Sequence, residues 1–264
     1  MSKDSPYRLL SAEDPAPVTV ERLDGASALF MTCDHAGRKI PKRLGDLGVP
    51  DAELQRHIAW DIGAEGVARG VCEQLDAALV IQTYSRLVID CNRQPSRHDS
   101  MARISEHTEI PGNHDLHPAH ADARVREIFD PYHETIAADL DRRHAAGQAS
   151  LLLAVHSFTP VYKGESRPWH VGLLYNRDDR VARVLMDLMS EESALSVGDN
   201  EPYAISDEGD YTIPVHGEQR GIPHIEIEIR QDLIETEAGQ RDWALRLIDW
   251  MGQAMERLNA GDST

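Results

Sequence analysis

Short apolar runs recur along this chain, and longer stretches with helical spacing of apolar residues lie between them. The runs are rich in aliphatic and β-branched side chains, which predicts buried strands. These strands are expected at residues 28–33, 78–81, 87–89, 150–155 and 171–175. At residues 225–230 apolar and charged side chains alternate, which predicts a strand with one packed face and one polar face.

Helical spacing predicts longer helices at residues 62–75, 123–144, 181–190 and 240–258, and Asp51 can cap a short one. We expect a bend at Pro131, inside the second of these helices. Residues 95–120 are polar and predict a long loop near a site. Because strands and helices alternate, we predict an α/β fold, with a mostly parallel mixed sheet and helices on both faces.

The composition bounds the domain organisation. The 264 residues suffice for one large α/β domain or two small ones, and no change in composition along the chain favours two. We therefore expect one domain over residues 25–260, preceded by a polar segment, residues 1–24, without regular structure. The three cysteines are odd in number and form no CxxC pair, which indicates reduced thiols in the packed interior.

Charge and hydropathy exclude several partners. The formal net charge is −18, from 45 acidic residues against 27 Lys and Arg, and this disfavours nucleic-acid binding, which needs a basic face. No apolar run has the length of a membrane span, and the N-terminus has no apolar secretory segment. We therefore expect a cytoplasmic protein without a nucleic-acid or membrane partner.

Residues 85–93 carry the densest concentration of candidate chemistry. The predicted strand 87–89 follows Arg86 and ends in Asp90, Asn92 and Arg93. Open α/β sheets bind ligands beyond the carboxyl ends of their strands, so these side chains are expected to face a site. Arg93 can hold a carboxylate by two parallel hydrogen bonds. The structural alternative is a salt bridge that pins a loop at the end of the strand.

Two histidines end two predicted strands. His35 follows the strand at 28–33 and His156 follows the strand at 150–155. Zinc takes imidazole nitrogen and carboxylate oxygen and keeps one position for water, so an acidic third ligand is required. Asp61 is the first candidate, although at the start of a predicted helix it serves equally well as an N-cap. Glu65, one turn further on, competes for the same role.

A hydrolytic metal site also needs a base for its water. Glu226 and Glu228 point to the same face of the alternating strand if that strand is regular, and Arg230 lies on it too. Two neighbouring carboxylates on a solvated face are the structural alternative.

These segments together resemble the N-formylglutamate amidohydrolase family. The resemblance covers roughly residues 28–235, and its most specific part is the arginine segment with its Asp-x-Asn-Arg ending. The matching segments are 33–36, 60–64, 85–93, 155–158 and 227–233. The family resembles the zinc carboxypeptidases in fold, with a three-layer sandwich, and its members hydrolyse N-formyl-L-glutamate to formate and glutamate.

The resemblance implies a role for each matching residue. His35, His156 and Asp61 would bind one zinc ion, and Glu228 would be the catalytic base. Asn92 and Arg93 would bind a substrate carboxylate, with Arg86 nearby, and we add Arg230 to the substrate-binding residues.

We therefore expect a metal-dependent amidohydrolase that cleaves a small amide, N-formylglutamate or a related N-acyl amino acid. One alternative is a non-catalytic protein that binds small carboxylates and has lost its metal. Another is a peptide or cell-wall amidase on the same fold.

Overall fold

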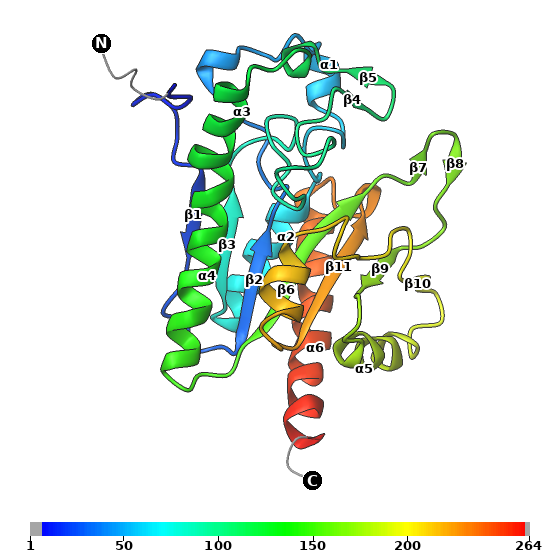
Figure 1. Cartoon of the computed structure of the whole chain (residues 1–264). Coiled ribbons are helices and arrows are strands. Elements are labelled where there is room, and N and C mark those ends of the chain that lie inside the picture. Colours follow the sequence, from blue (N-terminus) through cyan, green and yellow to red (C-terminus); the bar gives the residue numbers. More distant parts are fainter. Residues whose placement is uncertain (1–6, 262–264) are drawn as a thin grey trace.

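The computed structural model describes residues 7–261, and its centre is a seven-stranded sheet in the order β1-β3-β2-β6-β11-β9-β10 (Figure 1). The strands of the sheet are β1 (Val18–Glu21), β2 (Leu29–Cys33), β3 (Ala78–Gln82), β6 (Leu151–Phe158), β9 (Val171–Leu174), β10 (Val197–Asp199) and β11 (His224–Arg230). The four central strands β3, β2, β6 and β11 run parallel. At the two sides, β1 pairs antiparallel with β3, and β9 pairs antiparallel with β11 and parallel with β10.

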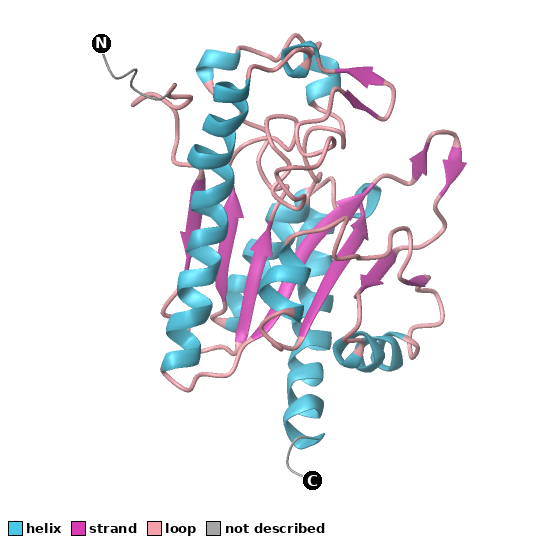
Figure 2. Cartoon of the chain, viewed as in Figure 1, coloured by secondary structure: helices cyan, strands magenta, loops and turns pink. Residues whose placement is uncertain are grey.

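Helices pack on both faces of this sheet, so the predicted α/β class is confirmed (Figure 2). One face is covered by α2 (Ala64–Leu75), α5 (Arg180–Met189) and α6 (Glu237–Gly261). The other is covered by α4 (Asp130–Ala145), which continues α3 (Pro118–Arg124) through a π-helical turn at Val125–Phe129.

Shorter elements complete the fold. They are α1 (Asp51–Leu54), the hairpins β4 (Ile104–Ser105) with β5 (Thr108–Glu109) and β7 (Val161–Tyr162) with β8 (Glu165–Ser166), 3-10 turns at Lys42–Leu44, Pro111–Asn113 and Gln231–Leu233, and a π turn at Ile213–Glu218.

The strand pattern divides the core into two layers. In β2, Leu29 and Met31 pack toward α2 and α6, whereas Phe30 packs toward α4. In β6, Leu153 packs toward α2 and α6, whereas Leu152 packs toward α4. Strand side chains alternate between the two faces of a sheet. His156 of β6 and Glu226 and Glu228 of β11 therefore point to the face that α4 covers.

One predicted strand is absent: residues 87–89 are buried but form turns. Side chains take the place of a neighbouring strand, because Asn113 Nδ2 donates to Leu87 O at 2.9 Å and Arg124 Nη1 donates to Val88 O at 2.8 Å. The apolar run 87–89 therefore indicates only that these residues are buried. A strand and a buried loop can have the same apolar sequence.

The polar N-terminal segment also differs from its prediction. Residues 18–21, expected to lack regular structure, form the edge strand β1. Pro131 lies directly after the π-helical turn that joins α3 to α4, so the helical run is irregular next to this proline.

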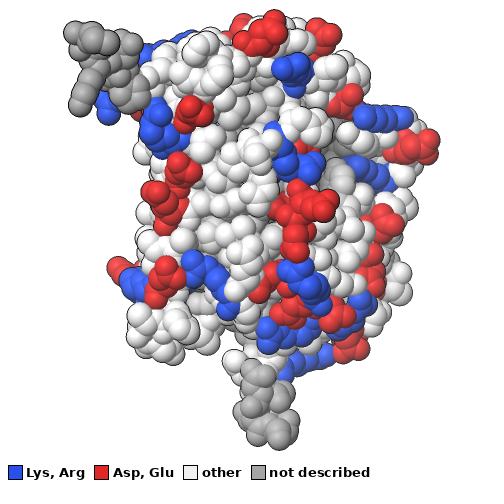
Figure 3. Space-filling model, in the orientation of Figure 1, with Lys and Arg blue, Asp and Glu red and all other residues white. Residues whose placement is uncertain are grey.

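Two features bear on possible partners: the apolar character of the helices, and the charges on one face of the molecule. Among residues 7–261, no helix is both long and apolar enough to cross a membrane. On the face drawn in Figure 3, basic side chains lie beside acidic ones. Ion pairs such as Arg177 with Asp207 and Arg183 with Asp199 neutralise exposed arginines.

Candidate metal centre

A cavity of about 470 Å³ lies beyond the carboxyl ends of β2 and β6 and beside the polar face of β11. The loop at residues 85–99 and the segment 203–210 form further walls. Its polar lining includes His35, Asp61, Arg86, Asp90, Asn92, Arg93, His156, Glu226 and Glu228. Seven of the eight predicted site residues are in this list, and Arg230 is the exception.

His35, Asp61 and His156 converge in the interior of this site, as predicted. One potential ligand atom from each lies within 4.8 Å of the others, and all three residues are buried. Asp61 Oδ2 is 2.8 Å from His156 Nδ1 and 3.4 Å from His35 Nδ1. These two nitrogens and one carboxylate oxygen match the ligands that zinc accepts.

Asp61 does not cap α2. The N-cap residue is Gly63, which has a φ of 81° and makes no side-chain cap. A Cβ at Gly63 would lie 2.1 Å from Ile234 O, so both the backbone angle and the close approach require glycine. Asp61 is held instead by its own N–H, which donates to His35 O at 2.9 Å.

The competing acid does not join the cluster. Glu65 pairs with Arg69 on the helix surface, with 2.8 Å between Arg69 Nη2 and Glu65 Oε1. The structure therefore favours Asp61 as the third ligand.

The outer nitrogen of each histidine contacts a second carboxylate. His35 Nε2 lies 2.7 Å from Asp90 Oδ1, and His156 Nε2 lies 3.1 Å from Asp34 Oδ2. Such contacts fix the imidazole tautomer, so that Nδ1 of each ring is left as the ligand atom. Nδ1 of His35 is buried and has no hydrogen-bond partner. The residues present therefore fit a divalent metal ion.

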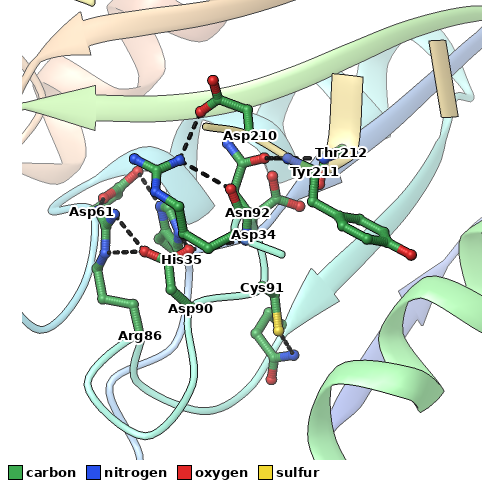
Figure 4. A network of polar contacts seen from close by, with 12 residues as sticks. Asp34, His35, Asp61, Arg86, Asp90, Cys91, Asn92, Asp210, Tyr211 and Thr212 are labelled. Carbon is green, nitrogen blue, oxygen red and sulfur yellow. Dashed lines mark hydrogen bonds and ion pairs between the residues drawn. The ribbon is translucent and has the colours of Figure 1, made fainter. Parts of the chain in front are cut away.

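Further residues position these carboxylates (Figure 4). Arg86 donates to Asp90 Oδ2 from Nη2 at 2.6 Å and from Nε at 3.1 Å. On the other side, Tyr132 of α4 donates its hydroxyl to Asp34 Oδ1 at 2.6 Å. The roles of Asp34 and Tyr132 were not predicted. The position of Asp34 immediately before His35 was the signal in the sequence, and nothing local marks Tyr132.

Tyr132→Phe is expected to weaken metal affinity by about tenfold, the lower end of the range for residues behind a metal ligand. Without the hydroxyl, Asp34 is free to turn away from His156. Tyr84→Phe is the matched control, because Tyr84 is also buried and donates to Pro15 O at 2.6 Å outside the cavity. Metal dissociation constants from chelator competition test this, and equal losses in both variants would contradict it.

Buried negative charge surrounds the two histidines. The buried acids of the site are Asp34, Asp61, Asp90, Glu226 and Glu228. Burial by itself would lower the pKa of His156, but Glu226, Asp34 and Asp61 together raise it well above its usual value. Because buried charge without compensation is costly, this arrangement favours a cation at its centre.

Glu226 and Glu228 both face the cavity from β11. Burial raises the pKa of Glu226 to about 8 and that of Glu228 to about 7. Glu226 Oε2 accepts a hydrogen bond from Asn92 Nδ2 at 3.3 Å, whereas Glu228 Oε2 is buried without a partner. Glu228 thus retains a free carboxylate oxygen beside the metal cluster.

The two residues at the end of the arginine segment have different surroundings. Asn92 is buried, and its Oδ1 accepts from the backbone N–H groups of Tyr211 and Thr212 at 3.1 and 3.0 Å. Arg93 Nη1 donates to Asp210 Oδ1 at 2.6 Å and to Asn92 O at 2.9 Å. The predicted alternative of a loop-pinning salt bridge is therefore present, although Arg93 also borders the cavity.

Arg230, which was predicted to bind substrate, is not among the residues that line the cavity. Its Nε donates to Asp232 Oδ1 at 2.8 Å, and its Nη1 lies 3.4 Å from the carbonyl oxygens of Pro168 and Trp169. The strand ends at this residue, and the paired guanidinium turns toward the loop before β9.

Taken together, the fold and the cluster define an α/β protein with a buried His–Asp–His site that can hold a metal ion. The family model described as N-formylglutamate amidohydrolase matches residues 27–235. This chain therefore belongs to the N-formylglutamate amidohydrolase family, a family of hydrolases, as the sequence motifs predicted.

Solved structures are similar over nearly the whole chain. A gene product of Agrobacterium tumefaciens is 36% identical, with a TM-score of 0.92 over 96% of this chain and 100% of that one. The N-formylglutamate amidohydrolase from Ralstonia eutropha is 17% identical, with a TM-score of 0.67 over 92% of this chain and 99% of that one, and it shares the fold. No curated protein matches the sequence at a significant level.

Proposed function

We propose that this protein hydrolyses the amide bond of a small N-acyl amino acid, N-formylglutamate or a related compound, with one zinc ion bound by His35, Asp61 and His156. The observation that carries the proposal is the free carboxylate oxygen of Glu228 beside this cluster, inside a cavity sized for a small molecule. Membership of the family supports the reaction class.

The chain supplies both the metal ligands and the proton transfer. A divalent ion held by the three ligands would polarise the amide carbonyl and lower the pKa of water. Glu228 accepts a proton from the attacking water and passes it to the leaving amine. Since burial raises its pKa to about 7, this side chain is suited to both halves of that transfer near neutral pH.

Arg93 is the proposed partner of a substrate carboxylate. Its Nη1 is engaged by Asp210, but among residues 7–261 no acceptor contacts its Nη2, and about a quarter of the side chain is exposed. Asn92 positions this arginine through its backbone carbonyl and ties the loop to Glu226 through its amide.

Arg86 has a different proposed role from the one predicted. It pairs with Asp90 and lies 3.5 Å from Asp61 Oδ1, so it positions the carboxylates around the metal. Its side chain is 27% exposed and lines the cavity.

A substrate panel tests the proposal. The zinc-loaded protein is assayed with N-formyl and N-acetyl amino acids and with short peptides, and hydrolysis of small N-acyl amino acids is expected. Turnover of peptides alone would favour the peptide or cell-wall amidase. Binding of carboxylates without turnover, together with no metal by elemental analysis, would favour the non-catalytic protein.

Arg93→Lys is expected to lower kcat/KM about ten- to a hundredfold on a substrate with a free carboxylate. Lysine keeps the charge but lacks the planar fork, and an unmade charge-assisted pair costs roughly 1.5–3 kcal/mol. The loss should shrink on the same substrate with that carboxylate converted to an amide. Equal losses on both forms would show that the pair with Asp210 is the whole role of Arg93.

A further inference from the structure

We propose that His133, held in one tautomer by His216, is a positioning residue for the metal ligand His35. It acts through the peptide unit that joins Cys91 to Asn92. This inference rests on the metal site of the proposed function. It adds two buried histidines that neither line the cavity nor enter the proposed mechanism.

The two histidines come from separate elements and meet in the interior. His133 lies near the start of α4, just after the π-helical turn at Val125–Phe129, and His216 lies in the π turn at Ile213–Glu218. Their rings stack with 5.3 Å between centroids and 15° between planes, and His133 Nδ1 lies 3.0 Å from His216 Nε2. Such π turns are rare and occur frequently at functional sites.

The surroundings of the pair fix where its protons lie. Burial lowers the pKa of His133 to about 4 and that of His216 to about 3, so near pH 7 each ring is neutral and carries one N–H. Because a carbonyl oxygen only accepts, His133 Nε2 carries the proton and donates to Cys91 O at 2.7 Å. His133 Nδ1 therefore accepts from His216 Nε2. His216 Nδ1 remains as a buried acceptor that has no partner within residues 7–261.

One peptide unit carries this contact to the metal ligand. Cys91 O and Asn92 N–H belong to the same planar group, so holding the oxygen fixes the direction of the N–H. That N–H donates to Asp90 Oδ1 at 2.9 Å, and His35 Nε2 lies 2.7 Å from the same oxygen. A hydrogen bond accepted at one end of a peptide also strengthens donation from the other end. His133 therefore holds Asp90 where it orients His35.

A separate contact holds the loop in place without the histidine pair. Asn92 Oδ1 accepts from the backbone N–H groups of Tyr211 and Thr212. These residues directly precede the π turn of His216, and the ring of Tyr211 packs on that of His133 with 4.4 Å between centroids. Loss of the bond from His133 is therefore expected to release the peptide unit while the loop keeps its place.

Two substitutions of His133 separate its two contacts. Glutamine can place an N–H where Nε2 was and keep the bond to Cys91 O, whereas asparagine reaches only the place of Nδ1 and loses that bond. His133→Asn is expected to weaken zinc binding about tenfold, and His133→Gln less than about threefold. Zinc dissociation constants from chelator competition give the measurement, which needs no turnover.

His224→Asn is the matched control. His224 is also buried and contacts a backbone carbonyl, with 2.7 Å between its Nδ1 and Ile222 O, but it lies outside the cavity lining. Zinc affinity should therefore be unchanged in this variant. Thermal unfolding of the metal-free proteins measures how much structure each of the three substitutions costs.

The outcomes separate this inference from the proposed function. Equal losses of zinc affinity in His133→Asn and His133→Gln, or no loss in either, would overturn the positioning role, whatever the unfolding temperatures. A protein that binds zinc and shows the selective loss, yet hydrolyses no N-acyl amino acid, would overturn the proposed reaction and keep the positioning role.

Discussion

Glu228→Gln is expected to keep its metal and lose about a hundredfold or more in kcat. Glutamine preserves the size of the side chain and its place on β11, but it cannot accept the proton of the attacking water. General acid–base catalysis typically accelerates a reaction by a factor of about 10²–10⁴. Steady-state kinetics give kcat, and elemental analysis gives the metal content.

Glu226→Gln is the matched control for this substitution. Glu226 is buried on the same face of the same strand, but its Oε2 already accepts from Asn92, and a glutamine oxygen can keep that contact. A much smaller loss in kcat is therefore expected. If Glu226 proves to be the more sensitive residue, the base has been assigned to the wrong glutamate of β11.

Asp61→Ala is expected to reduce metal affinity more than a hundredfold. Changing a residue that only hydrogen-bonds to a metal ligand typically costs about 10–100-fold, and Asp61 is a proposed ligand itself. The substitution removes one of three ligands and also the carboxylate that both imidazoles contact. Activity should fall with the metal content and return in part at high zinc concentration. Zinc titration with a chromophoric chelator gives the affinity.

Glu65→Ala is the control for the third ligand. Glu65 lies one turn along α2 from Asp61 but pairs with Arg69, so its loss should leave zinc affinity unchanged. Circular dichroism of both variants excludes a general loss of structure. Zinc loss in Glu65→Ala with retention in Asp61→Ala would reverse the assignment of the third ligand.

The residues of the candidate metal site could be predicted because local patterns specify them. His35 and His156 each follow a run of apolar residues that becomes a buried strand, β2 or β6. Parallel strands bring their carboxyl ends to one edge of a sheet, so the two histidines were expected to meet. Asp61 remained ambiguous, because a carboxylate at the start of a helix is equally consistent with capping. The left-handed Gly63, which takes the N-cap place, resolves that ambiguity.

Residues whose partners are distant in the sequence were beyond prediction. Arg230 shares the alternation of Glu226 and Glu228, yet its guanidinium pairs with Asp232 outside the cavity. Tyr132 reaches Asp34 from α4, across almost a hundred positions of the chain.

The sequence by itself determined the α/β class, the family, the principal strands and the histidine and glutamate positions, because apolar periodicity and short motifs are local properties. The tertiary structure alone decided that residues 87–89 are a buried loop, that β1 lies at the sheet edge, and which acids stand behind His35 and His156. Those outcomes depend on hydrogen-bond and charge partners supplied from elsewhere in the chain, and only the packed fold brings these partners within reach.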